Sequence, residues 1–304
     1  MKRNLFIILI IFLAAVGGFI YFTKDEISFT RETSMYKAVP VSAPFFFEFK
    51  SLKSVPFSNP AVNELVESEM GTIFFSLLQE SDSLIQISEK FPKSLRNESF
   101  ILAFDFTGRN QPVPLFIREV ENNNQRRAFE ALVQELYPAT DYLLENRKYS
   151  KYEITGLTEK GNPENQLFYA FTEGLFFAGT KSIPVEQAVR QLISRGILNN
   201  PYFEKVNRTV TAQSEISLYI NHENFPAYLR NLLNSQTIRG KNEFGENSNN
   251  NYQKAVQGFA DFASWTELDF NFEDDYISFG GISVADDSLN HFLSVFGEQQ
   301  PRSE

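Results

Sequence analysis

A unit of strand, tight turn, strand and amphipathic helix recurs along this chain of 304 residues. Three copies pair two strands each, over residues 99–106 with 113–120, 166–171 with 175–179, and 267–272 with 276–282. Tight turns demand antiparallel pairing, and Gly174 can supply the positive φ that such a turn needs. The sequence therefore predicts an α+β fold: a curved antiparallel sheet built from strand-turn-strand-helix units, with the helices on one face and one N-terminal transmembrane helix.

The helices are predicted from apolar stripes at helical spacing. Four stripes are visible: Phe129, Leu132, Val133 and Leu136; Val185, Ala188, Val189 and Leu192; Tyr228, Leu229, Leu232 and Leu233; and Leu289, Phe292, Leu293 and Phe296. Ser182 is a candidate N-cap for the second helix, and a further strand over 215–220 precedes the third. The last stripe predicts a helix from about Asp287 to Phe296 that docks on the sheet with Phe292 fully buried.

An uncharged run from Leu5 to Phe22 follows a basic head that contains Lys2 and Arg3. In helical form it spans about 27 Å, close to the hydrocarbon core of a bilayer. The cations before it favour a cytoplasmic N-terminus. We expect residues 5–22 to contact the lipid bilayer as a single-pass anchor in the inner membrane, with the domain periplasmic. A cleaved signal peptide with a small-residue site at 15–17 is the alternative.

The domain organisation follows from this segment. We expect an anchor over residues 1–22, a stalk over 23–35, one extracytoplasmic α+β domain over 36–297, and a disordered tail over 298–304. Residues 236–251 are almost free of apolar side chains and are predicted to form a loop.

Composition limits the classes of partner and chemistry. The formal charge is −10, and the part beyond the basic head carries 26 cations against 38 anions, or −12. A domain with this much negative charge is repelled by phosphate backbones. Nucleic acid is therefore not an expected partner. The chain has no cysteine, which excludes disulfides, thiol catalysis and thiolate metal sites.

Phenylalanine is unusually frequent, with 32 residues against 12 tyrosines and one tryptophan. One interpretation is that these rings fill core positions on strands and helices. The other is that they line an apolar cavity for a lipid or acyl ligand. The sequence leaves both open.

Motifs of catalysis are absent from the sequence. It contains no G-x-S-x-G elbow, no P-loop and no G-x-G-x-x-G, and the two histidines, His222 and His291, lack the spacing of a zinc-protease helix. We predict that His222 makes a polar contact at a helix start and that His291 lies on a helix surface. No catalytic, cofactor-binding or metal-binding residue is predicted.

A glycosidase needs only two carboxylates facing a cleft. The visible candidates are Asp105, Glu173, Asp274, Asp275, Asp286 and Asp287. Most have a structural explanation, since Asp274-Asp275 lies at a hairpin turn and Asp286-Asp287 precedes a helix, where anions suit the dipole. Asp105 alternates with Phe104 and Phe106, so we expect it to point to solvent.

Four segments carry a resemblance to a known family: residues 38–40 with 45–49, 179–192, 200–203 and 217–222. In them the chain resembles uncharacterised single-anchor envelope proteins common in Bacteroidetes, a domain-of-unknown-function family. The resemblance covers most of residues 36–300. It implies an envelope location and supplies no active site or cofactor.

These observations lead to a functional hypothesis. We expect a non-enzymatic, membrane-anchored cell-envelope domain for interaction or scaffolding, with another envelope protein as its partner. The alternative is a periplasmic carrier or chaperone of lipids or other apolar ligands. An enzyme with two converging carboxylates is the third hypothesis.

Overall fold

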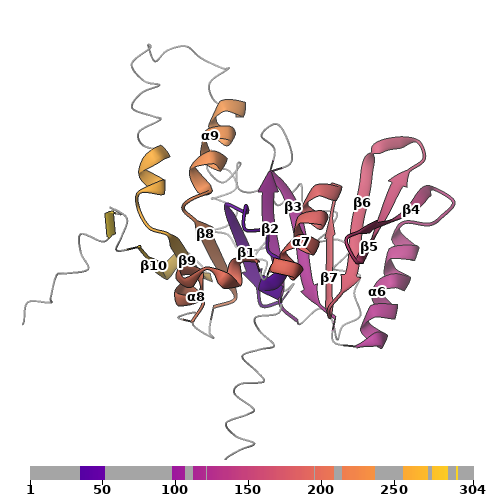
Figure 1. Cartoon of the computed structure of the whole chain (residues 1–304), viewed down its shortest axis with the longest axis horizontal. Coiled ribbons are helices and arrows are strands. Elements are labelled where there is room, and N and C mark those ends of the chain that lie inside the picture. The colour runs from indigo at the N-terminus through magenta and orange to yellow at the C-terminus, as the bar shows by residue number, and fades with distance from the viewer. Residues whose placement is uncertain are drawn as a thin grey trace, which may run out of the picture.

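In the part of the chain that the structure describes, ten strands form one open antiparallel sheet in the order β10-β9-β8-β1-β2-β3-β7-β6-β5-β4 (Figure 1). The computed structural model describes residues 35–51, 98–106, 112–120, 122–194, 196–208, 214–236, 256–272, 276–286 and 292–293. The sheet and its flanking helices confirm the α+β class. β10 and β4 lie at opposite ends of the molecule (Figure 1).

The strands run β1 (Phe45–Phe49), β2 (Phe100–Phe106), β3 (Pro112–Glu119), β4 (Tyr142–Tyr149), β5 (Tyr152–Glu159), β6 (Asn162–Thr172), β7 (Leu175–Gly179), β8 (Ile216–Asn221), β9 (Trp265–Phe272) and β10 (Ile277–Val284). The helices are η1 (Met35–Ala38), α6 (Asn123–Leu136), α7 (Ser182–Ser194), η3 (Gly196–Asn199), α8 (Pro201–Asn207) and α9 (Phe225–Gln236). The hairpins β2–β3, β6–β7 and β9–β10 confirm the three predicted strand pairs.

The turn between β6 and β7 shows why its sequence makes a tight hairpin. Glu173 has φ 50° and Gly174 has φ 77°, so both central residues lie in the left-handed region. Consecutive positive φ values match the twist of the flanking strands. Glycine adopts this region without strain, which makes Gly174 the residue that permits the turn.

The central strands are buried on both faces, and this explains their continuous apolar sequences. All five residues of β1 are buried, and Phe46 points to one face while Phe45 and Phe47 point to the other. The Phe46 face is called the first face below, and the Phe45 face the second.

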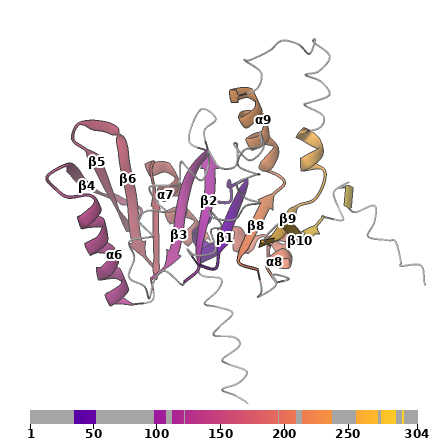
Figure 2. The same ribbon diagram turned by 180° about the vertical axis from the view of Figure 1, so that it is seen from behind.

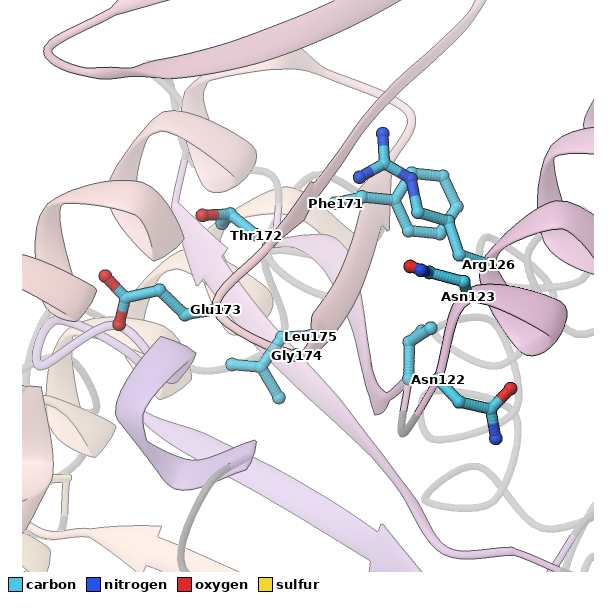
Figure 3. Close-up of a pocket in the computed structure, with 9 residues that line it drawn as sticks. Asn122, Asn123, Arg126, Phe171, Thr172, Glu173, Gly174 and Leu175 are labelled. Carbon is cyan, nitrogen blue, oxygen red and sulfur yellow. The ribbon is translucent and has the colours of Figure 1, made fainter.

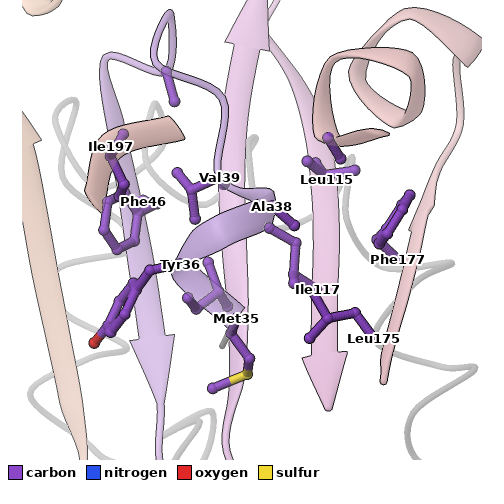
Figure 4. Close-up of a cluster of buried hydrophobic side chains, with 14 of the residues drawn as sticks. Met35, Tyr36, Ala38, Val39, Phe46, Leu115, Ile117, Leu175, Phe177 and Ile197 are labelled. Atoms are coloured by element: carbon purple, nitrogen blue, oxygen red, sulfur yellow. The ribbon is translucent and has the colours of Figure 1, made fainter. Parts of the chain in front are cut away.

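On the first face, η1, α7, η3 and α8 cover the sheet. Figure 4 shows Tyr36 and Val39, from η1 and the residue after it, lying over Phe46, with Ile117 further along the sheet. The stripe of α7 is buried there as predicted, with Val185, Ala188, Val189 and Leu192 all in this cluster.

On the second face, α6 and α9 pack on a layer of aromatic rings. Phe129 of α6 stacks on Phe176 with ring centroids 4.8 Å apart, and Tyr228 of α9 contacts Phe45 at the same distance. The prediction that helices occupy one face only is therefore wrong. The two views in Figures 1 and 2 show α6 and α7 on opposite sides of the sheet. The reason is that the pleat places apolar residues on both faces, so each face needs its own cover.

β1, the first described strand, lies inside the sheet, and later strands extend the sheet on both sides of it. β1 pairs with β2 on one side and with β8 on the other. The connection from β7 to β8 crosses the first face through α7, η3 and α8. The hairpin of β4 and β5 was not predicted, because six of the eight residues of β4 are exposed and its sequence lacks apolar alternation.

The predicted last helix is only partly within the described residues. Phe292 is 57% exposed, so the prediction that it is fully buried is wrong. Its ring lies 6.2 Å from that of Phe262, and its N–H donates to the Asp261 carbonyl at 2.6 Å. The ring therefore contacts Phe262 while more than half of its surface stays exposed. Leu289 and Phe296 lie outside the described residues.

Several other predictions also fall outside the described residues. These are the anchor over 1–22, the turn at Gly108, most of the polar loop over 236–251, and the tail over 298–304. Of the predicted stalk only Met35 is described, and it is buried in η1, so it belongs to the domain. Within the described ranges, no helix is long and apolar enough to span a membrane.

Candidate functional site

Three buried carboxylates gather on the first face, on strands β1 and β9. Strand register places them, because Glu48 lies opposite Ser217 of β8, and Ser217 lies opposite Asp269 of β9. In the adjacent row, Tyr219 of β8 lies opposite Glu267 of β9. Glu48, Glu267 and Asp269 are all buried, with Glu267 only 1% exposed. We call these three residues, with Tyr36, Ser217 and Tyr219, the carboxylate cluster.

Tyr36 hydrogen-bonds the Glu48 carboxylate, and Tyr219 in turn contacts Tyr36. The Tyr36 hydroxyl donates to Glu48 Oε2 at 2.5 Å and lies 3.2 Å from the Tyr219 hydroxyl. Burial and the charge of Glu48 hold the pKa of both tyrosines well above the ordinary value, so they remain neutral. Lys50 Nζ also reaches Glu48 Oε1, at 3.4 Å. Glu48 is thus held by a cation and a hydroxyl donor.

Glu267 has a different environment. No hydrogen-bond partner for its Oε1 is found among the described residues. Burial raises its pKa to about 8, and the hydrogen bond with Asp269 and the charge of Asp269 add to the rise. Ser217, which donates to Asp269 Oδ1 at 2.8 Å, acts in the opposite direction on Glu267. Glu267 and Asp269 are therefore a pair that keeps a proton at neutral pH.

This arrangement can store a proton in the interior of the domain. The side chains lie under the helices of the first face and expose less than a tenth of their surface. Among the described residues, no group of three or more His, Cys, Asp or Glu has a geometry that could hold a metal ion.

None of these three carboxylates is among the candidates predicted from the sequence. A signal was present, because Glu48 interrupts the aromatic run of β1, and Glu267 and Asp269 alternate with apolar residues in β9. Alternation on an outer strand normally indicates a solvated face. Here α8 covers that face. A local sequence pattern in β9 cannot show that a helix from another part of the chain will pack on it.

His222 is buried and fully engaged. Its Nδ1 lies 2.7 Å from the Phe259 carbonyl, and its Nε2 lies 2.8 Å from Thr266 Oγ1, which in turn lies 2.7 Å from Ser283 Oγ. The predicted polar contact exists, but it joins β8 to β9, β10 and residue 259 rather than serving the start of α9. His291 lies outside the described residues.

Asp105 is 4% exposed, so the prediction that it points to solvent is wrong. Alternation did place it on the face opposite Phe104, but that face is covered by the segment between η1 and β1. Ser42 Oγ from this segment donates to Asp105 Oδ2 at 3.0 Å, and the Phe106 N–H donates to Oδ1 at 2.8 Å. Burial raises the pKa of Asp105, and the two hydrogen bonds oppose the rise.

The two other carboxylate candidates that the structure describes, Glu173 and Asp286, lie on different parts of the sheet and do not converge. Glu173 lies at the β6–β7 turn, where it accepts from the Tyr152 hydroxyl and lies 3.8 Å from Lys151 Nζ. Asp286 lies just beyond β10. Asp274, Asp275 and Asp287 are outside the described residues.

A polar hollow lies beside the start of α6, with a volume of about 190 Å³. Figure 3 shows the Arg126 side chain beside the ring of Phe171, and its guanidinium carbon lies 5.4 Å from the ring centroid. Arg126 also binds Glu130 at 2.8 Å, and the Asn122 side chain caps α6. The hollow is lined by polar groups that already bind one another, so it does not offer the apolar surface that a lipid or acyl ligand needs.

The two edge strands of the described sheet differ in character. β10 has eight residues and no charge, and Phe279 is 58% and Ile282 39% exposed. β4 exposes Leu143 and Leu144 but also carries Glu145, Arg147 and Lys148. Charged side chains protect an edge from pairing with other chains, and an uncharged edge lacks that protection.

Comparison with known proteins gives no relative: no family model, curated protein or solved structure matches the chain.

Proposed function

We propose that this protein is a non-enzymatic, membrane-anchored cell-envelope domain that binds another envelope protein, and that the binding site is the outer edge of β10. The observation that carries the proposal is that β10 ends the described sheet with eight uncharged residues and exposed Phe279 and Ile282. The anchor at residues 5–22 and the periplasmic location are part of the proposal. They rest on the uncharged run behind Lys2 and Arg3.

The chemistry of the edge indicates the kind of partner. An unpaired edge offers a row of backbone N–H and C=O groups that an extended segment can continue as a further strand. Phe279 lies opposite Phe270 on the second face, and Ile282 lies opposite Glu267 on the first face. A partner strand would therefore place apolar residues beside both. Since the chain has a net charge of −10, the segment should be neutral or basic.

A carrier of apolar ligands finds less support in the described residues. The aromatic side chains pack on one another in two core clusters, as in the stacked pair of Phe49 and Phe100 at 4.8 Å. Rings packed at these distances belong to a filled interior. A ligand carrier requires an apolar cavity, and copurification of lipid with the domain would support that alternative.

Site-specific photocrosslinking in intact cells tests the binding edge. A photoreactive amino acid at position 279 should crosslink to a discrete envelope protein, whereas the same residue at position 144 on β4 should not. Phe279→Lys on β10, with the probe moved to position 282, should abolish the crosslink, and the matched variant Leu144→Lys should retain it. Equal crosslinking from both edges would refute binding at β10.

The anchor needs its own test. A reporter fused after Glu304 should be active only outside the cytoplasm, and the mature protein should keep residues 1–22. A mature N-terminus at Gly18 would instead show a cleaved signal peptide.

A further inference from the structure

Strand β9, which carries Glu267 and Asp269 of the carboxylate cluster, pairs with the edge strand β10. Register places Glu267 opposite Ile282 and Asp269 opposite Gly280 on β10. Helix α8 packs over both strands and buries Phe203 and Val206. The two carboxylates of β9 therefore lie in an apolar layer between the sheet and α8, one strand away from the edge.

The groups around this pair come from every neighbouring element. Glu48 of β1 adds a third carboxylate, and Tyr36 of η1 and Tyr219 of β8 add neutral hydroxyls. Lys50 brings a cation to Glu48, with its Nζ 3.4 Å from Oε1.

On α8, the charged residues turn to solvent: Glu204 binds Arg208 at 2.5 Å, and Lys205 lies over the Tyr202 ring at 5.6 Å. Glu267 and Asp269 therefore lie near a third buried carboxylate, that of Glu48. The charged side chains of α8 point to solvent and do not neutralise the pair. A proton is the simplest way to remove one negative charge from this pair.

We propose that a proton shared by Glu267 and Asp269 holds β9 and β10 in the sheet, and that loss of this proton as the pH rises loosens this end of the domain. Ionising both side chains places two like charges side by side in a buried, apolar layer, which is costly. Opening the strands restores their hydration. This proton switch does not depend on whether β10 binds a partner.

The direction of the effect follows from the pKa of the pair. In the opened state Glu267 returns to its ordinary pKa of 4.5, whereas in the closed state its pKa is about 8. Between these values the closed state holds a proton that the opened state has lost. Each rise of one pH unit in this window shifts the equilibrium toward opening by up to about tenfold.

Hydrogen exchange of the full chain tests the switch. Protection factors, which remove the intrinsic pH dependence of exchange, should fall in β9 and β10 by roughly ten- to a hundredfold between pH 6 and pH 8. Those of β4 and β5 should change little. Glu267→Gln keeps the shape and a hydrogen-bond donor but cannot ionise, so its β9 and β10 protection should be independent of pH.

The control variant Glu223→Gln removes an exposed carboxylate near β8 and should behave like the wild type. Persistence of the full pH dependence in Glu267→Gln would overturn the proposal, as would flat protection in the wild type. Infrared spectroscopy gives a second measurement: the wild type should show a protonated carboxyl band at pH 6 that disappears by pH 9 and that is weaker in Glu267→Gln, which leaves the buried Asp105 unchanged. The absence of this band at pH 6 would also overturn the proposal. A failed crosslink at position 279 would leave these results unaffected.

Discussion

The two ends of the sheet meet water in opposite ways. At the β4 end, six of the eight residues of the edge strand are exposed, and Arg147 pairs with Glu186 of α7. At the β10 end, the edge strand has no charge, and a buried polar network from His222 to Ser283 ties it to the sheet. The charged side chains of β4 thus protect that edge from pairing with other chains. The edge strand β10 is instead held in the sheet by the buried network behind it.

This difference shows how an edge can be left available for pairing. Charges on an edge strand prevent association with other chains but also prevent recognition. An uncharged edge must be held in register by other means, here by apolar packing, by the His222 network and by the carboxylate pair of β9. The four predictions that follow test this contrast, from the largest expected effect to the smallest.

The largest effect is expected when a buried side chain that fixes one end of the sheet to the core is truncated. Trp265 of β9 is 2% exposed and packs on Phe203 at 5.1 Å and on Phe46 at 6.4 Å. Trp265→Ala should cost about 3–5 kcal/mol of unfolding free energy, measured by urea denaturation. Ile154→Ala at the β4 end should cost about 2–4 kcal/mol, within the range for a buried isoleucine. A larger loss for Ile154 would reverse the contrast.

The second test is the pH dependence of stability. Because the folded-state pKa of Glu267 is raised to about 8, its contribution is fully present below pH 4.5 and is lost as pH rises to about 8. The unfolding free energy should fall by up to about 1.4 kcal/mol per pH unit in that window and level off above it. Glu267→Gln should remove this slope, whereas Glu145→Gln on β4 should keep it. Urea titrations at several pH values measure both.

The third test uses two adjacent glycines of β10. A Cβ on Gly281 would overlap the Glu267 backbone carbonyl and lie 2.9 Å from Leu268 Cα, whereas nothing lies within 4 Å of a Cβ on Gly280. Gly281→Ala should therefore cost about 1–3 kcal/mol by forcing β10 away from β9. Gly280→Ala should change stability by less than about 1 kcal/mol. Similar melting temperatures for the two variants would show that β10 does not approach β9 this closely.

The smallest effect is expected from charges placed on the two edges. Phe279→Lys removes a ring contact with Phe270 at 4.9 Å and should cost about 0.5–1.5 kcal/mol. Leu144→Lys should stay within about 0.5 kcal/mol of the wild type, as for other exposed positions. Differential scanning calorimetry can resolve this difference. A costlier change at Leu144 would mean that β4 is the edge with the more important contacts.

The sequence alone predicted the local elements well where turn chemistry and periodicity agreed. The β6–β7 hairpin follows from Glu173-Gly174, and the buried stripe of α7 follows from Val185 and its helical neighbours. It failed at the β4–β5 hairpin, because a strand exposed on most of its length carries no apolar alternation. It failed again at Asp105, since alternation separates two faces but does not show that both are covered.

The sequence by itself determined the hairpins β2–β3, β6–β7 and β9–β10, the apolar stripe of α7, the aromatic content of the core and the absence of charge on β10, because each depends on residues close together in the chain. Only the tertiary structure decided that β1 lies inside the sheet, that helices cover both faces, and that Glu48 shares one face and one buried region with Glu267 and Asp269. This arrangement requires β8 to pair with β1 across more than 160 residues of chain, and also with β9, whose paired residues lie 44 to 54 positions further along. Long-range pairing is selected by the total burial of the fold, which no local pattern contains.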